Sequence, residues 1–209
     1  MKYILDLNKR AWDNLANNYD TRTIQELSKT FINFTSMLPE KGKVLDLGCG
    51  TGLPHDKYLA EAGFHVLGVD ISEEILKKAK MNVPDGTFFQ LSMNKIEYTE
   101  EFNGVISSFS MLLLPPDLFK ETAYRIHSAL VKGGYFFLSL NEPANGQGDI
   151  DSEAFTNIMG QDMYSRAYTV GEVQSIFTPL GFSQVKFNRD THVSDEFGEE
   201  HVIEFIYQK

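Results

Sequence analysis

The spacing of apolar residues changes character about 40 residues into the chain. Before that point, apolar side chains such as Ala11 and Leu15 recur at intervals of three and four, which is the period of an amphipathic helix. Thr23 followed three positions later by Glu26 has the form of a capping box, so it predicts a second helix that runs to residue 38. The first 38 residues are therefore predicted to be helical.

From residue 43 onward, short apolar runs alternate with helical stretches. The runs lie at residues 44–47, 65–69, 88–91, 104–107 and 135–140. They are apolar on both sides, which is typical of strands that are buried on both faces of a sheet. Their alternation with helices predicts a parallel sheet that is covered on both faces.

The end of the chain has a different pattern. A helix is predicted over residues 169–180, and Gly181 ends it. Two strands are predicted at residues 184–189 and 201–207, with an acidic loop between them. Such a pair fits a hairpin, so we expect an antiparallel strand at the end of the sheet.

A glycine-rich turn, Asp46-Leu47-Gly48-Cys49-Gly50-Thr51-Gly52, follows the first predicted strand. Glycines allow positive φ and let a ligand approach the backbone without a Cβ in the way. The helix that follows offers unpaired N–H groups. Asp70 ends the next predicted strand, where a carboxylate can accept both hydroxyls of a ribose. Together these features predict a bound nucleoside at the carboxyl ends of the strands.

The spacing of the turn distinguishes between nucleoside ligands. A dinucleotide-binding turn reads Gly-x-Gly-x-x-Gly and holds a pyrophosphate. Leu53 stands where that pattern places its last glycine, and Asp46 would repel a pyrophosphate. The same acid can attract an ammonium group. S-adenosylmethionine matches, because it has a ribose, an adenine and an amino-acid end without a phosphate.

These motifs resemble those of the class I S-adenosylmethionine-dependent methyltransferases of the small-molecule type. Residues 46–52 resemble the family's first motif, and residues 68–72 resemble its second, whose acid binds the ribose. Residues 102–109 are similar to the fourth-strand motif, with Asn103-Gly104 in place of a commoner Phe-Asp pair. Residues 11–20 are similar to an N-terminal helix that closes over the cofactor in many members.

The resemblance implies the fold class. We expect an α/β, Rossmann-like, seven-stranded and mostly parallel sheet with an antiparallel C-terminal strand, helices on both faces and a helical N-terminal extension. Residues 1–209 would form one domain. We expect a helical cap over residues 1–38, a cofactor-binding half over residues 39–141, and an acceptor-side loop with the C-terminal hairpin over residues 142–209.

The resemblance also implies which residues bind the cofactor. Ser92 and Met93 stand where the family often has an acid for the adenine, and we expect them to replace it. Leu112-Leu113 stands where many relatives carry two histidines, so we expect a more apolar acceptor cavity. The expected cofactor-binding residues are Tyr19, Asp46, Gly48, Cys49, Gly50, Gly52, Asp70, Ile71, Ser92, Met93, Ser108 and Phe109.

The implied reaction is methyl transfer to a small-molecule acceptor by in-line displacement, for which no catalytic residue can be named. Glu142, Tyr164, Arg166 and Tyr168 are candidates for the acceptor pocket, with Arg166 holding an acceptor carboxylate; the alternative is that all four are surface loop residues. A non-catalytic S-adenosylmethionine-binding module keeps the same motifs. An NAD-dependent oxidoreductase is opposed by the glycine spacing and by Asp46.

Composition narrows the expected partners. The 209 residues include 19 basic and 29 acidic side chains, a net charge of −10, which disfavours nucleic acid and anionic membranes as partners.

Cys49 is the single cysteine, so no intrachain disulfide can form. The five histidines are scattered, and we expect no metal site. No apolar run approaches the length of a membrane span. We expect a cytoplasmic protein, either a monomer or a homodimer.

Overall fold

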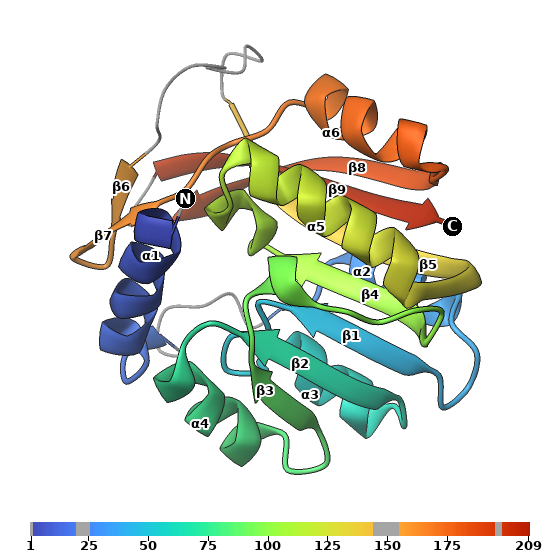
Figure 1. The fold of residues 1–209 in the computed structure, drawn as a ribbon, viewed down its shortest axis with the longest axis horizontal. Coiled ribbons are helices and arrows are strands. Elements are labelled where there is room, and N and C mark those ends of the chain that lie inside the picture. Colours follow the sequence, from blue (N-terminus) through green and yellow to red (C-terminus); the bar gives the residue numbers. More distant parts are fainter. Residues whose placement is uncertain (1, 20–25, 144–154, 195–197) are drawn as a thin grey trace.

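The protein is described from a computed structural model, in which residues 2–19, 26–143, 155–194 and 198–209 are placed. Seven strands form one sheet in the order β3-β2-β1-β4-β5-β9-β8 (Figure 1). Their bounds are β1 Lys43–Leu47, β2 His65–Asp70, β3 Thr87–Gln90, β4 Phe102–Ser108, β5 Leu130–Glu142, β8 Ser183–Ser194 and β9 Gly198–Gln208. Strands β1 to β5 are parallel and β9 is antiparallel to both of its neighbours, so the predicted fold class is confirmed.

Helices cover both faces of this sheet. Their bounds are α1 Lys2–Leu15, α2 Lys29–Ser36, α3 His55–Glu61, α4 Glu73–Asn82, α5 Pro116–Ala129 and α6 Val170–Phe177. Figure 1 shows α5 and α6 in front of the sheet and α2 and α3 behind it, and α4 shares a core cluster with β3 and α3. The cores of both layers are rich in phenylalanine, including Phe119, Phe136 and Phe177 on one side and Phe31 and Phe34 on the other. No helix among the described residues is long and apolar enough to cross a membrane.

The N-terminal helices begin and end at different residues than predicted. Helix α1 ends at Leu15, and Asn18 N–H closes a turn onto the Leu15 carbonyl at 2.9 Å. Helix α2 begins at Lys29, because the Ser28 hydroxyl accepts the Phe31 N–H at 3.0 Å and serves as the N-cap. Thr23, the predicted cap, lies outside the described residues.

The C-terminal hairpin joins the sheet in an order that the sequence did not predict. Strand β9 is inserted between β5 and β8, so β8 forms the edge. The reason is burial, because β9 has apolar side chains on both faces: Phe205 packs into one core and Ile206 into the other. Strand β8 tolerates the edge, since its Val185 and Val193 side chains are exposed.

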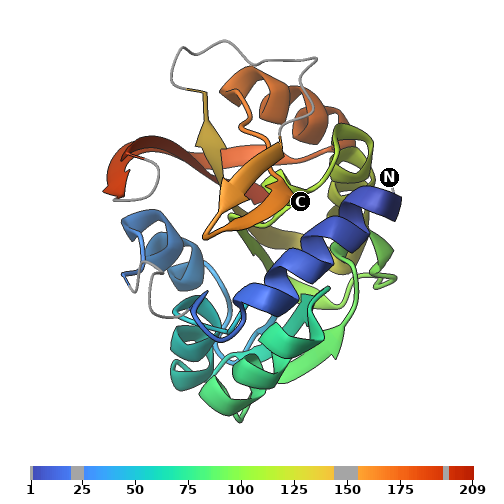
Figure 2. The same ribbon diagram turned by 90° about the vertical axis from the view of Figure 1, so that its left-hand side faces the viewer.

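A cap formed by α1 and a short hairpin lies across the carboxyl ends of the parallel strands (Figures 1 and 2). The hairpin, β6 Phe155–Ile158 and β7 Gln161–Tyr164, was not predicted. The buried Asn8 amide joins the two parts: its Nδ2 donates to the carbonyls of Leu113 and Tyr164 at 3.1 and 3.0 Å, and its Oδ1 accepts the Tyr164 N–H at 2.8 Å. The cap therefore covers the carboxyl ends of the parallel strands, where the glycine turn lies.

Candidate cofactor site

The three glycines of the turn all have positive φ, +73° at Gly48, +56° at Gly50 and +77° at Gly52. A Cβ on Gly48 would lie 2.5 Å from the Ser110 Cβ, and one on Gly52 would lie 2.9 Å from the Val83 Cγ2. A Cβ on Gly50 would meet only the Tyr19 ring, at 3.9 Å. Gly48 and Gly52 are thus required by packing within the protein, whereas Gly50 borders open space that a ligand can occupy.

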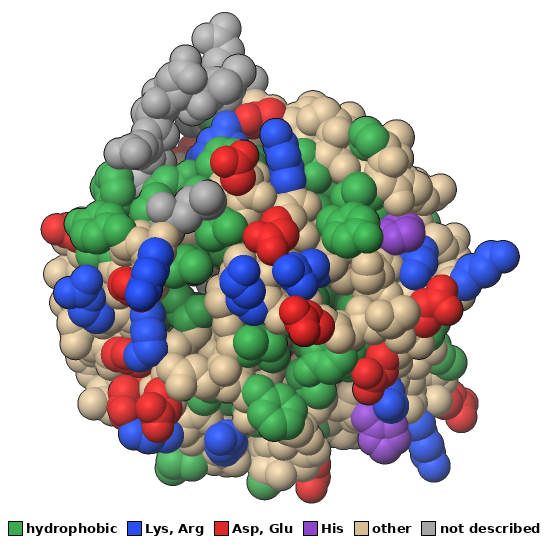
Figure 3. Space-filling view, in the orientation of Figure 1, with side chains coloured by type: hydrophobic (Ala, Val, Ile, Leu, Met, Phe, Trp, Pro, Cys, Tyr) green, Lys and Arg blue, Asp and Glu red, His purple; other side chains and the backbone are tan. Residues whose placement is uncertain are grey.

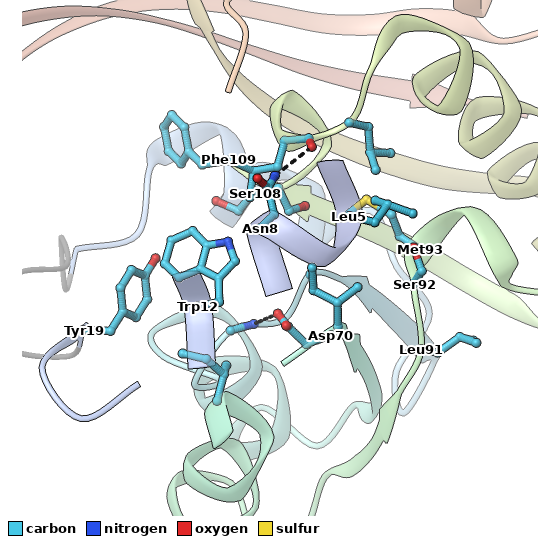
Figure 4. Close-up of a pocket in the computed structure, with 17 residues that line it drawn as sticks. Leu5, Asn8, Trp12, Tyr19, Asp70, Leu91, Ser92, Met93, Ser108 and Phe109 are labelled. Carbon is cyan, nitrogen blue, oxygen red and sulfur yellow. Dashed lines mark hydrogen bonds between the residues drawn. The ribbon is translucent and has the colours of Figure 1, made fainter. Parts of the chain in front are cut away.

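Asp70 connects the end of β2 to this turn. Its Oδ2 accepts the Gly50 N–H at 3.1 Å and its Oδ1 accepts the Ser72 N–H at 2.8 Å (Figure 4). Burial raises the pKa of Asp70 to about 6, and the backbone N–H groups partly oppose that rise. The carboxylate is therefore mainly ionised at neutral pH, and each oxygen keeps a lone pair for a further donor.

A pocket lies between α1 and the strand ends, with about 690 Å³ of empty space when its open mouth is included. This is within the roughly 300–1,000 Å³ typical of small-molecule pockets. The Trp12 and Tyr19 rings pack edge to face at 5.2 Å on its α1 side (Figure 4). The lining residues are Leu5, Asn8, Trp12, Tyr19, Gly48, Gly50, Asp70, Ile71, Ile75, Leu91, Ser92, Met93, Ser108, Phe109, Ser110, Leu113 and Leu114.

The end of β4 brings a strained residue into this pocket. Phe109 has φ +50°, in the left-handed region that residues with a bulky side chain rarely adopt. Its N–H is held by the Ser139 hydroxyl at 3.2 Å, and its side chain is 38% exposed. Strain of this kind costs about 1–3 kcal/mol and is concentrated at functional sites.

Two buried acids lie behind the glycine turn. Asp46 is the penultimate residue of β1, and Asp56 belongs to the first turn of α3. Their side chains are almost completely buried and their carboxyl groups interact. Burial raises the pKa of Asp46 well above its usual range and that of Asp56 to about 7. Among the described residues, no donor reaches the Asp46 Oδ1 or either Asp56 oxygen. A cationic group beside Asp46 would compensate this arrangement, so the turn fits the ammonium of S-adenosylmethionine.

A second, larger space adjoins the pocket, with about 2200 Å³ of empty volume when open solvent is included. We call it the polar groove. It runs from the glycine turn across the faces of β5, β9 and β8. The pocket and the polar groove share the lining residues Tyr19, Gly48, Gly50, Ser108 and Phe109.

Most of the predicted cofactor residues line these two spaces. Nine line the pocket: Tyr19, Gly48, Gly50, Asp70, Ile71, Ser92, Met93, Ser108 and Phe109. Asp46 and Cys49 line the polar groove, and burial raises the pKa of the Cys49 thiol well above its usual range. Gly52 lines neither space. Direct contact of these twelve residues with the cofactor stays a prediction.

The predicted acceptor residues are placed elsewhere. The nearly buried Arg166 forms an ion pair with Glu172, and its guanidinium lies 4.4 Å from the centre of the Tyr168 ring. Tyr168 is 1% exposed, within the core. Neither residue, nor Tyr164, lines the pocket or the polar groove, so their interpretation as acceptor ligands is wrong. Glu142 binds the Arg189 guanidinium with two hydrogen bonds, of 2.5 and 2.8 Å.

The sequence did not identify Leu5 and Asn8 as residues that line the pocket. Together with Trp12 they lie on one face of α1 and line the pocket. Their spacing of three and four residues is a helical signal, but it also fits an ordinary core-facing stripe. Within the placed parts of the chain, no group of three or more His, Cys, Asp or Glu side chains could hold a metal ion.

Fold and site together define an α/β protein with a pocket of suitable size for a nucleoside at the carboxyl ends of parallel strands. Residues 44–134 match the family model for a methyltransferase domain. A methyltransferase of Synechocystis is 37% identical over 105 residues, which span 49% of this chain and 49% of that protein. The chain thus spans about half the length of this curated relative.

Solved structures share the fold. An S-adenosylmethionine-dependent methyltransferase from Listeria monocytogenes has a TM-score of 0.70 at 24% identity, over 86% of this chain and 97% of that one. A Burkholderia thailandensis 1,6-didemethyltoxoflavin N1-methyltransferase, bound to 1,6-didemethyltoxoflavin and S-adenosylhomocysteine, has a TM-score of 0.68 at 20% identity, over 97% and 88%. Residues 44–134 are thus similar to a methyltransferase domain, and the chain has the fold of S-adenosylmethionine-dependent methyltransferases.

Proposed function

We propose that this protein transfers a methyl group from S-adenosylmethionine to a small-molecule acceptor by in-line displacement. The observation that carries the proposal is the junction of two spaces. A pocket suited to a nucleoside opens, at Gly50, Ser108 and Phe109, into a groove with room for a second molecule. A donor and an acceptor can meet there.

We assign the cofactor's parts to residues by their chemistry. Asp70 is the acceptor for the ribose hydroxyls, because its oxygens keep free lone pairs beside the pocket. Ser92, Met93 and Ile71 form the adenine end, and Asp46 attracts the ammonium. When bound, S-adenosylmethionine supplies an electrophilic methyl group.

The protein's own contribution is alignment of the two reactants. Orientation in a closed site can lower a barrier by about 7–11 kcal/mol. His55 lines the polar groove, but burial lowers its pKa to about 4, so its ring is neutral at physiological pH. A group with so low a pKa is a weak proton acceptor, so we assign no catalytic base. Helix α1 and the β6–β7 hairpin act as the cap, whereas α2, which also falls within residues 1–38, packs behind the sheet. Residues 39–141 bind the cofactor, and residues 142–209 provide most of the acceptor side.

The polar groove also distinguishes this proposal from a non-catalytic binding module. A sensor needs only the pocket, whereas the groove adds a solvent-accessible space that shares five lining residues with it. The small-molecule class of acceptor is supported by the similar Burkholderia enzyme, which acts on 1,6-didemethyltoxoflavin. Acidic and basic side chains are interspersed on the face in Figure 3, without one large patch of either sign there.

The test is turnover with a panel of small acceptors, measured as S-adenosylhomocysteine production. We expect at least one acceptor to give production above the acceptor-free rate, and Gly50→Ala to lose it. Binding of S-adenosylmethionine without turnover across the panel would favour the binding module.

A further inference from the structure

The floor of the polar groove is a row of polar side chains that crosses four neighbouring strands. Ser108 of β4 is opposite Ser139 of β5, Ser139 is opposite Glu204 of β9, and Glu204 is opposite Asn188 of β8. All four residues line the polar groove. The Ser108 and Ser139 hydroxyls lie 3.2 Å apart, and the Asn188 Nδ2 donates to the Glu204 Oε2 at 3.3 Å. The row begins at the junction with the pocket.

Glu204 is the unusual member of this row. It is the one charged residue in the run Val202-Ile203-Glu204-Phe205-Ile206-Tyr207, and it is only 6% exposed. No Lys, Arg or His forms an ion pair with it in the described part of the chain. A carboxylate offers about four acceptor positions, and the hydrogen bond from Asn188 uses one. A buried carboxylate with so few partners is costly unless a ligand compensates it.

The charges around the polar groove favour a cationic ligand. Its charged lining residues are Glu26, Asp46, Asp190, Glu200 and Glu204 on the acidic side, and Lys29, Lys186 and Arg189 on the basic side. The Arg189 guanidinium is already bound by both oxygens of Glu142. The excess of negative charge disfavours a carboxylate or phosphate in this space.

We propose that the acceptor is a small molecule with a cationic amine, and that Glu204 binds this amine as a specificity-determining residue. The inference rests on the proposed function. Neighbouring strands are about 4.8 Å apart, so Glu204 lies two strand spacings, or about 10 Å, from Ser108 at the junction. The amine therefore binds far from the atom that is methylated, and the acceptor is a small molecule that spans roughly this distance.

The experiment uses protein loaded with S-adenosylhomocysteine and three matched probe pairs: tyramine with 4-hydroxyphenylacetate, benzylamine with benzoate, and phenethylamine with 3-phenylpropionate. Binding is measured by saturation-transfer NMR and calorimetry. We expect the amines to bind at least tenfold more tightly than their carboxylate partners. Glu204→Gln should weaken amine binding at least tenfold and leave the affinity for S-adenosylhomocysteine within twofold.

The matched control is Glu199→Gln, which makes the same substitution at an exposed residue of the same strand that does not line the polar groove, and it should change amine binding less than twofold. Absent amine binding, a preference for the carboxylates, or amine binding that Glu204→Gln leaves unchanged would overturn the inference. If Glu204→Gln fails to bind S-adenosylhomocysteine, the inference is tested by the unmodified protein, through its affinities for the amines and for their carboxylate partners. If the unmodified protein itself does not bind S-adenosylhomocysteine, the proposed function fails instead.

Discussion

The pocket and the polar groove share five lining residues and are built in opposite ways. The pocket lies at the ends of parallel strands, where glycines and backbone N–H groups form the turn and apolar side chains of α1 close it. The polar groove lies along the face of the strands β5, β9 and β8, and alternate side chains such as Ser139, Glu204 and Asn188 form its floor.

This contrast explains which properties of the pocket and of the polar groove can change through amino-acid substitution. A space shaped by backbone accepts few substitutions, since Gly48 and Gly50 both need a left-handed conformation. A space shaped by strand side chains can change its polarity residue by residue while the sheet stays the same. We infer that the fold fixes the cofactor and that the groove side chains select the acceptor.

The largest expected effect comes from Gly48→Ala. The new Cβ would lie 2.5 Å from the Ser110 Cβ in a residue with φ +73°. Left-handed strain of about 1–2 kcal/mol and overpacking of about 1–3 kcal/mol should together lower the free energy of unfolding by roughly 2–5 kcal/mol. Urea denaturation measures this change. Gly63→Ala is the control, because Gly63 has φ +89° with no atom near its Cβ position, so it should show the strain alone.

Asp70→Asn should weaken binding of S-adenosylhomocysteine by about 2 kcal/mol, or roughly 30-fold, because two hydrogen bonds to a charged acceptor are lost or weakened. Calorimetric titration measures the loss. The exposed Asp85→Asn removes the same charge and should leave the affinity unchanged. If both variants bind alike, Asp70 does not contact the cofactor.

Asn8→Ala tests the cap. The variant leaves the buried Tyr164 N–H and two carbonyls without their side-chain partner, which costs about 1–3 kcal/mol. We expect faster amide exchange in α1 and β7, together with weaker binding of S-adenosylhomocysteine. Asn14→Ala removes a single exposed contact, to Gln161, and should leave both unchanged. Unaltered exchange in Asn8→Ala would contradict the role of Asn8 as the joint of the cap.

The smallest expected effect is on the pH dependence of stability. The folded pKa of Asp56, about 7, is above that of an unfolded Asp, so the folded state holds more protons between these values. Its free energy of unfolding should therefore fall as pH rises from about 4 to 7. Asp56→Asn should flatten this fall, which urea denaturation at several pH values measures. A pH profile parallel to that of the unmodified protein would contradict the burial of an ionisable Asp56.

The sequence was most informative where backbone geometry defines the structure. The glycine turn, Asp70 and the strands β1, β2, β4 and β5 were predictable because glycine spacing and two-sided apolar runs have few structural solutions. Strand β3 forms as predicted, but it is an edge strand and its Phe89 is exposed. Ser72, which follows Asp70, caps α4, with its hydroxyl accepting the Ile75 N–H at 3.1 Å.

The sequence was least informative where several solutions compete for one pattern. Arg166 fits an acceptor ligand as well as a buried ion pair, and only the fold places Glu172 beside it. The hairpin of β6 and β7 has no strong turn signal. Glu204 was hidden within an apolar strand, and its exposure to the groove depends on the insertion of β9 between β5 and β8.

The most direct test of the whole account is calorimetric titration of the unmodified protein with S-adenosylhomocysteine and, separately, with NAD⁺. We predict saturable binding of one S-adenosylhomocysteine per chain, no saturable heat with NAD⁺, and at least tenfold weaker S-adenosylhomocysteine binding by Gly50→Ala. Saturable binding of NAD⁺ in preference to S-adenosylhomocysteine, or no binding of S-adenosylhomocysteine, would contradict the account.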